Sequence, residues 1–86
     1  KYPTLTFYTS PSCGLCKEVK LELQHLHLRY PHRLQKIDID TDRTLFAQYF
    51  DKIPVVQVGD EELRAPITAV QLENLLKKAT NSSNRI

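Results

Sequence analysis

The 86-residue sequence has no methionine or tryptophan, and only two glycines and two cysteines. It contains no apolar run long enough to cross a bilayer and no signal-peptide pattern. The net charge is +2 and charges of both signs are interspersed, which is not typical of proteins that bind nucleic acid or anionic membranes. We therefore expect a monomeric protein in the cytoplasm that binds neither nucleic acid nor membrane.

The two cysteines, Cys13 and Cys16, are three positions apart. A secreted domain held together by disulfides normally has four or more cysteines that join distant segments. A bridge across so short a loop adds little stability, because the loop-closure entropy lost by the unfolded chain grows with loop length. The pair therefore indicates redox chemistry or metal binding in a reducing compartment rather than a structural crosslink.

Hydrophobic periodicity predicts one domain over residues 1–86, with the order β-α-β-α-β-β-α and a polar tail from about residue 80 to 86. A first half of the βαβ type and a second half made of a hairpin and a helix predict an α/β fold of three layers. Its four-stranded mixed sheet has helices on both faces. The predicted strands are 4–9, 34–39, 53–58 and 62–65, and the predicted helices begin at Cys13, after Asp42 and after Thr68.

Three aspartates, Asp38, Asp40 and Asp42, lie close together between the second strand and the second helix. Such a cluster can bind Mg²⁺ or Ca²⁺, but no glycine pattern of a calcium loop accompanies it. We interpret it as a strand end followed by a helix cap. Thr68 and Gln71 have the spacing of a capping box at the start of the last helix.

A Cys-x-x-Cys pair beside a βαβ pattern is typical of a redox motif. Cys13 lies at the start of the first helix, where free backbone amides and the helix dipole stabilise a thiolate. Cys16 follows almost one turn later and deeper in the helix, so its sulfur can approach that of Cys13. We therefore predict that Cys13 attacks a substrate disulfide and that Cys16 resolves the mixed disulfide.

These features, together with Ile53-Pro54-Val55 and Gly59, resemble the glutaredoxin-like branch of the thioredoxin superfamily over roughly residues 4–79. The resemblance implies a thioredoxin fold and a cis peptide bond before Pro54, which would lie against the cysteine pair. It also implies that backbone groups of Ile53 pair with the substrate chain. The residues that we predict to bind substrate are Tyr8, Gly14, Leu15, Ile53, Pro54 and Arg64.

The sequence departs from glutathione-dependent glutaredoxins in two places. Residues 9–12 lack the lysine that usually precedes the first cysteine, and residues 64–68 replace a Gly-Gly pair followed by an acidic residue. Arg64 and the amides near Thr68 are the possible substitutes for these glutathione-binding groups. We expect no bound cofactor and a protein or small-molecule disulfide as substrate. Glutathione or a flavoenzyme of the thioredoxin-reductase type is the electron donor, and the sequence favours the flavoenzyme.

Three other hypotheses use the same residues. Cys13, Cys16, His27 and His32 resemble a zinc site, but the helix would separate the cysteines from the histidines by about 15 to 20 Å. An iron–sulfur cluster shared between two protomers, with glutathione as co-ligand, is known in some glutaredoxins. A redox-sensing or protein-interaction module would use the groove at Ile53 and Pro54 without turnover. We predict no metal ligands in this chain.

Overall fold

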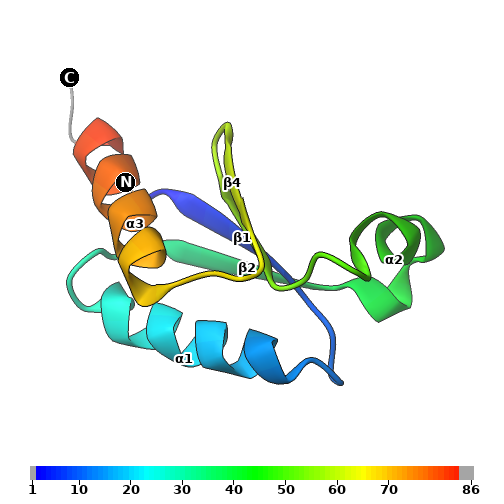
Figure 1. The fold of residues 1–86 in the computed structure, drawn as a ribbon. Coiled ribbons are helices and arrows are strands. Elements are labelled where there is room, and N and C mark those ends of the chain that lie inside the picture. The colour runs from blue at the N-terminus through cyan, green and yellow to red at the C-terminus, as the bar shows by residue number, and fades with distance from the viewer. Residues whose placement is uncertain (1, 84–86) are drawn as a thin grey trace.

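The computed structural model describes residues 2–83, and its elements follow the predicted order (Figure 1). The elements are β1 (Thr4–Thr9), α1 (Gly14–His27), β2 (Arg33–Asp38), the 3₁₀ helix η1 (Ile39–Thr41), α2 (Arg43–Tyr49), β3 (Val55–Val58), β4 (Glu61–Arg64) and α3 (Ala69–Ser83). The short helix η1 is the one element among the described residues that the sequence did not predict. Helix α1 ends at His27, and the amides of Arg29 and Tyr30 then both donate to the carbonyl of Leu26 and form a turn before Pro31.

The four strands form a mixed sheet in the order β2-β1-β3-β4. β1 is parallel to β2, whereas the β1–β3 and β3–β4 pairs are antiparallel. The register places Val56 between Phe7 on one side and Leu63 on the other. Figure 1 shows α1 and α3 near each other, with α2 at the far end of the sheet. The predicted three-layer α/β fold with a mixed sheet is therefore confirmed.

The main hydrophobic core lies between the sheet, α1 and α3. Its buried members are Leu5, Phe7, Cys16, Val19, Leu23, Leu26, Val56, Leu72, Leu75 and Leu76. A smaller cluster of Ile39, Tyr49 and Val55 packs against α2, with Tyr8 beside it. The helical spacing of Leu15, Val19, Leu23 and Leu26 forms one apolar stripe along α1. The stripe is buried from Val19 onward, but Leu15 at its start is 56% exposed. Leu15 is therefore free to contact something other than the core.

Side-chain caps begin the helices as the sequence predicts. Asp42 Oδ1 accepts hydrogen bonds from the amides of Thr44 and Leu45 at the start of α2. Asp38 Oδ1 accepts from the amide of Asp40 at the start of η1. These contacts satisfy amides that otherwise have no partner in the first turn of a helix. Two of the three clustered aspartates are thus caps, and residues 2–83 contain no group of three or more His, Cys, Asp or Glu side chains that could hold a metal ion.

The last helix is longer than the sequence suggests. α3 continues to Ser83, which is four residues into the predicted polar tail, and positions 84–86 of that tail lie outside the described residues. Within the part of the chain that the structure describes, no helix combines the length and the apolar character needed to cross a membrane.

Candidate functional site

Cys13 and Cys16 form a disulfide across the first turn of α1. Cys13 is the N-cap residue, in an extended conformation with φ −93° and ψ 108°, and its amide donates to the carbonyl of Ser10 over 3.1 Å. The amide of Cys16 donates to Sγ of Cys13, also over 3.1 Å. The first turn contains no acidic side chain that would oppose a negative charge on this sulfur. The start of α1 therefore presents a donor and the positive end of its dipole to Cys13.

The two sulfur-bearing residues differ in exposure. Cys16 is 2% exposed and belongs to the main core, whereas Cys13 is only partly buried and packs at the edge of that core. Gly14, between them, is exposed, and a Cβ atom added to it would meet no atom within 4 Å. Gly14 is thus not required for close packing within the domain.

The Ile53–Pro54 peptide bond is cis, as the resemblance implies, and the ring of Pro54 is fully buried. The amide of Ile53 donates to the carbonyl of Tyr49 over 3.1 Å, because the chain turns back directly after α2. No backbone amide of residues 2–83 donates to the carbonyl of Ile53. Of the two backbone groups of Ile53, the amide is therefore already bonded within the fold, and the carbonyl is the group left for a substrate chain.

Tyr8 and Arg64, two of the predicted substrate-binding residues, lie on the α2 side of the sheet. The ring of Tyr8 stacks on that of Tyr49, with 4.4 Å between the centroids. Burial, with a contribution from Tyr8, raises the pKa of Tyr49 above its ordinary value. Arg64 is opposite Val55 in the β3–β4 pair, and its Nε donates to Glu62 Oε2 over 2.6 Å. That hydrogen bond raises the pKa of Arg64.

Two amides at the start of α3 already have side-chain acceptors. Thr68 Oγ1 accepts from the amide of Gln71, and Gln71 Oε1 accepts from the amide of Thr68. The predicted capping box is therefore formed in both directions. Just before it, the Ala65–Pro66 bond is also cis, and the amide of Ala65 donates to the carbonyl of Lys52 over 3.2 Å. This bond ties the loop before α3 to the segment before Pro54.

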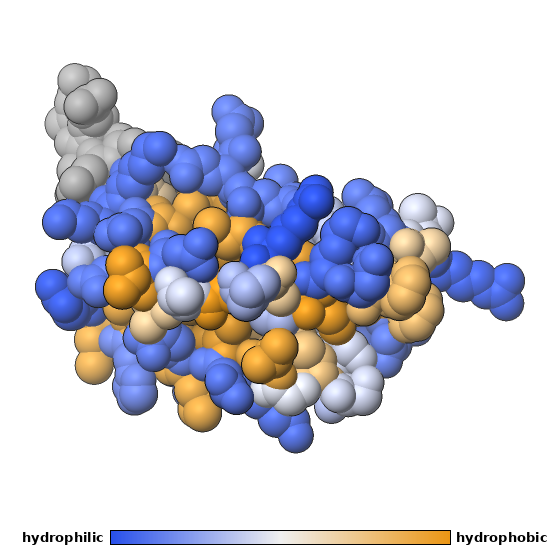
Figure 2. All heavy atoms as spheres, in the orientation of Figure 1, coloured by the Kyte–Doolittle hydropathy of each residue, from blue (hydrophilic) through white to orange (hydrophobic). Residues whose placement is uncertain are grey.

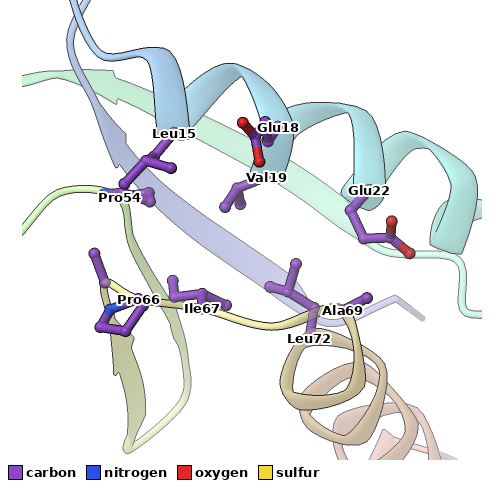
Figure 3. A pocket seen from close by; sticks show the side chains of 10 residues that line it. Leu15, Glu18, Val19, Glu22, Pro54, Pro66, Ile67, Ala69 and Leu72 are labelled. Atoms are coloured by element: carbon purple, nitrogen blue, oxygen red, sulfur yellow. The ribbon is translucent and has the colours of Figure 1, made fainter.

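A groove of about 240 Å³ runs between α1 and the loop that leads into α3, and we call it the α1 groove (Figure 3). It is lined by Leu15, Glu18, Val19, Glu22, Pro54, Ala65, Pro66, Ile67, Ala69 and Leu72. It therefore brings together Leu15 and Pro54, two of the predicted site residues. The sequence analysis did not identify Glu18, Glu22 or Pro66. Two sequence features could have indicated them. Glu18 and Glu22 are acidic residues one turn apart beside the apolar stripe of α1, and Pro66 is a second proline shortly before a helix.

A second cavity of about 240 Å³ lies on the other side of α1 and is lined in part by Cys16. Three basic side chains also line it, from Lys17, Lys20 and Lys36. Helix α1 thus separates an acidic groove on one side from a basic cavity on the other, and Lys17 belongs to the basic side.

The two histidines of the zinc hypothesis lie at the opposite end of α1 from the cysteines. Their rings contact each other edge to face, with 5.0 Å between the centroids of His27 and His32. His32 is buried, its Nδ1 is 2.8 Å from the carbonyl oxygen of Tyr30, and burial lowers its pKa. A single zinc ion with tetrahedral ligands at about 2.0 to 2.3 Å cannot join groups at both ends of a 14-residue helix.

Comparison with known proteins identifies relatives of the whole domain. Residues 4–78 match the family model described as Glutaredoxin-like domain (DUF836). The chain is 27% identical to target protein XcR50 from X. campestris, with a TM-score of 0.72 and coverage of 87% of this chain and 97% of that one. It is 26% identical to protein Ne2328 from Nitrosomonas europaea, with a TM-score of 0.71 and coverage of 87% and 92%.

Thioredoxin O1 from Arabidopsis thaliana in its oxidised state has the same fold, with a TM-score of 0.75 at 20% identity and coverage of 92% of this chain and 78% of that one. No curated protein matches the chain.

Proposed function

The chain belongs to the Glutaredoxin-like domain family (DUF836), and we propose that it is a thiol–disulfide oxidoreductase that reduces substrate disulfides through Cys13 and Cys16. Its fold is that of thioredoxin-type proteins, and its cysteine pair supports a redox function.

In the first step, the thiolate of Cys13 attacks one sulfur of a substrate disulfide. A bond forms between the two sulfurs and the other substrate sulfur leaves as a thiolate. The thiolate of Cys16 then attacks Sγ of Cys13, which forms the Cys13–Cys16 disulfide and releases the second substrate thiolate. Two electrons pass from the protein dithiol to the substrate, and the product thiolates take up the protons that the two cysteines release.

The observation that carries this proposal is the contrast between the two cysteines. An attacking sulfur must reach the substrate, and Cys13 is the more exposed of the pair. A resolving sulfur needs to reach only its partner, and Cys16 is buried one turn away. The amide of Cys16 at Sγ of Cys13 also stabilises a thiolate there, and thiolate character determines which cysteine reacts first.

We further propose that a thioredoxin-reductase type of flavoenzyme, rather than glutathione, returns the electrons. Glutathione carries two carboxylates, and each of the two sequence features that could have bound them is already paired in part within the fold. The amides of Thr68 and Gln71 are capped within the helix, and Arg64 pairs with Glu62 on the α2 side of the sheet. The same observation argues against an iron–sulfur cluster that depends on glutathione as co-ligand.

A single-turnover experiment tests the oxidoreductase assignment. The reduced protein is mixed with an excess of a cystine-containing peptide, quenched by alkylation at successive times, and analysed by mass. The proposal expects reduced peptide to form in step with protein that carries the Cys13–Cys16 disulfide, and expects no reduced peptide with the Cys13→Ser variant. A wild-type protein that stays fully alkylatable while the peptide stays oxidised would overturn the proposal.

A further inference from the structure

We propose that the α1 groove binds the substrate chain beside its disulfide, and that it selects an apolar side chain next to the reacting cysteine with a lysine or arginine beyond it. This specificity rests on the oxidoreductase function proposed above, which supplies the reason for a substrate chain to lie there.

One end of the groove is formed by Leu15 and Pro54. Leu15 lies between Cys13 and Cys16 in the sequence, is 56% exposed and faces Pro54 across the end of the groove (Figure 3). Farther along, Val19 and Leu72 form an apolar floor with Ile67. An apolar side chain that follows a bound cysteine would be removed from water here, which favours binding in proportion to the apolar area buried.

The wall opposite α1 is held in place before any substrate arrives. The amide of Ala65 donates to the carbonyl of Lys52, and the capping box of Thr68 and Gln71 fixes the start of α3. A groove that is already formed loses little conformational entropy on binding. Figure 2 shows hydrophobic surface gathered between α1 and the start of α3, with hydrophilic side chains around it.

The charge of the groove specifies the second part of the ligand. Glu18 and Glu22 lie one turn apart on the α1 wall. Neither forms an ion pair with any residue between positions 2 and 83, and the groove has no basic lining residue. The lysines of α1 line the cavity on its other side instead. The groove therefore attracts a cation and repels the carboxylates of an acidic peptide or of glutathione.

Two cystine peptides that differ in one residue test this specificity. Both have leucine after the reacting cysteine, and one continues with lysine where the other has glutamate. We expect the wild-type protein to reduce the lysine peptide with the higher kcat/KM, by roughly threefold to tenfold, because the two glutamates attract the lysine and repel the glutamate. In the Glu18→Gln/Glu22→Gln variant this ratio falls towards one, and in wild type it falls as salt is added.

The matched control is Asp60→Asn, which removes a negative charge from the exposed β3–β4 turn, outside the α1 groove. We expect this variant to keep the wild-type ratio. Equal kcat/KM values for the two peptides in wild type, or a ratio that survives loss of both glutamates, would overturn the proposed specificity.

A binding measurement separates this inference from the oxidoreductase assignment. The oxidised wild-type protein is titrated with cysteine-free versions of the two peptides, and backbone amide shifts are followed by NMR. We expect the lysine peptide to shift the amides of Leu15, Ile67 and Ala69 at lower concentration than the glutamate peptide does. If the groove binds the lysine peptide in this way but the reduced protein reduces no disulfide, the oxidoreductase assignment is wrong and the proposed specificity of the α1 groove is kept. If disulfides are reduced but neither peptide shifts these amides, the proposed specificity is wrong and the oxidoreductase assignment is kept.

Discussion

The backbone amide of Cys16 donates a hydrogen bond to Sγ of Cys13 over 3.1 Å, so the residue that would resolve the reaction also supplies a donor to the sulfur that would begin it. In the reduced protein this donor favours the thiolate of Cys13, while Cys16 is surrounded by the hydrophobic core. We predict that iodoacetamide alkylates Cys13 at least about tenfold faster than Cys16 near neutral pH, as measured by peptide mass after short exposure. Equal rates would contradict the assigned roles.

Substitution of each cysteine separates attack from resolution. Cys13→Ser should abolish the reduction of a disulfide substrate, because the remaining sulfur, that of Cys16, is buried in the core. Cys16→Ser should still attack but should accumulate a mixed disulfide between Cys13 and the substrate, visible as an adduct in the intact mass under non-reducing conditions. Loss of reduction in the Cys16 variant without any trapped adduct would show that Cys13 does not act first.

Pro54 is buried beside Leu15 at the end of the α1 groove that adjoins the cysteine pair. We predict that Pro54→Ala lowers kcat/KM for a disulfide substrate by at least about tenfold, since small displacements at a reacting centre have large effects on rate. Its free energy of unfolding, measured in urea, should fall by less than about 2 kcal/mol. Pro31→Ala, in the turn after α1, is the control and should keep full activity. Unchanged turnover in a folded Pro54 variant would remove this residue from the site.

His32 makes stability depend on pH. Burial holds its pKa below the ordinary value of 6.5. Two smaller effects oppose each other: the hydrogen bond to the carbonyl of Tyr30 raises the pKa and the neighbouring His27 lowers it. The unfolded chain therefore binds more protons than the folded one once the pH falls below 6.5. The contribution of neutral His32 to the free energy of unfolding is therefore complete above pH 6.5, and it is lost as the pH falls toward the lowered pKa of the folded state. The slope cannot exceed about 1.4 kcal/mol per pH unit.

Urea unfolding at about pH 7.5 and about pH 5.5 measures this effect. We expect His32→Gln to reduce the loss of stability on acidification, and the exposed His25→Gln to leave it as in wild type. A wild-type stability that rises on acidification, or a His32 variant with the same pH dependence, would contradict the account.

Much of the fold was predictable because its signals are local. Asp42 and the Thr68–Gln71 pair are neighbours in sequence of the amides they cap, so their types and spacing alone indicate where α2 and α3 begin. Gly59, the one residue with positive φ (58°) among those described, is in the predicted hairpin turn. The position of Cys13 at a helix start follows from the same kind of pattern.

The composition of the site was less predictable because it depends on which faces meet. Alternation along β1 places the side chains of Tyr8 and Phe7 on different faces of the sheet. Both faces are partly covered by helices, so the pattern does not predict that Tyr8 stacks on Tyr49. Helical periodicity puts Leu15 on the apolar stripe, but whether the end of a stripe is buried depends on where α3 crosses it. The partner of the Ile53 amide is likewise set by how tightly the chain turns after α2.

A redox titration of the purified protein tests the central claim most directly. Protein is equilibrated with graded ratios of reduced to oxidised glutathione, quenched by alkylation and analysed by mass. The account predicts one reversible two-electron transition between the dithiol and the Cys13–Cys16 disulfide, at a potential between about −270 and about −180 mV, with no accumulated glutathione adduct. If no reversible disulfide forms, or if the thiols react only after a metal is removed, the oxidoreductase assignment is wrong.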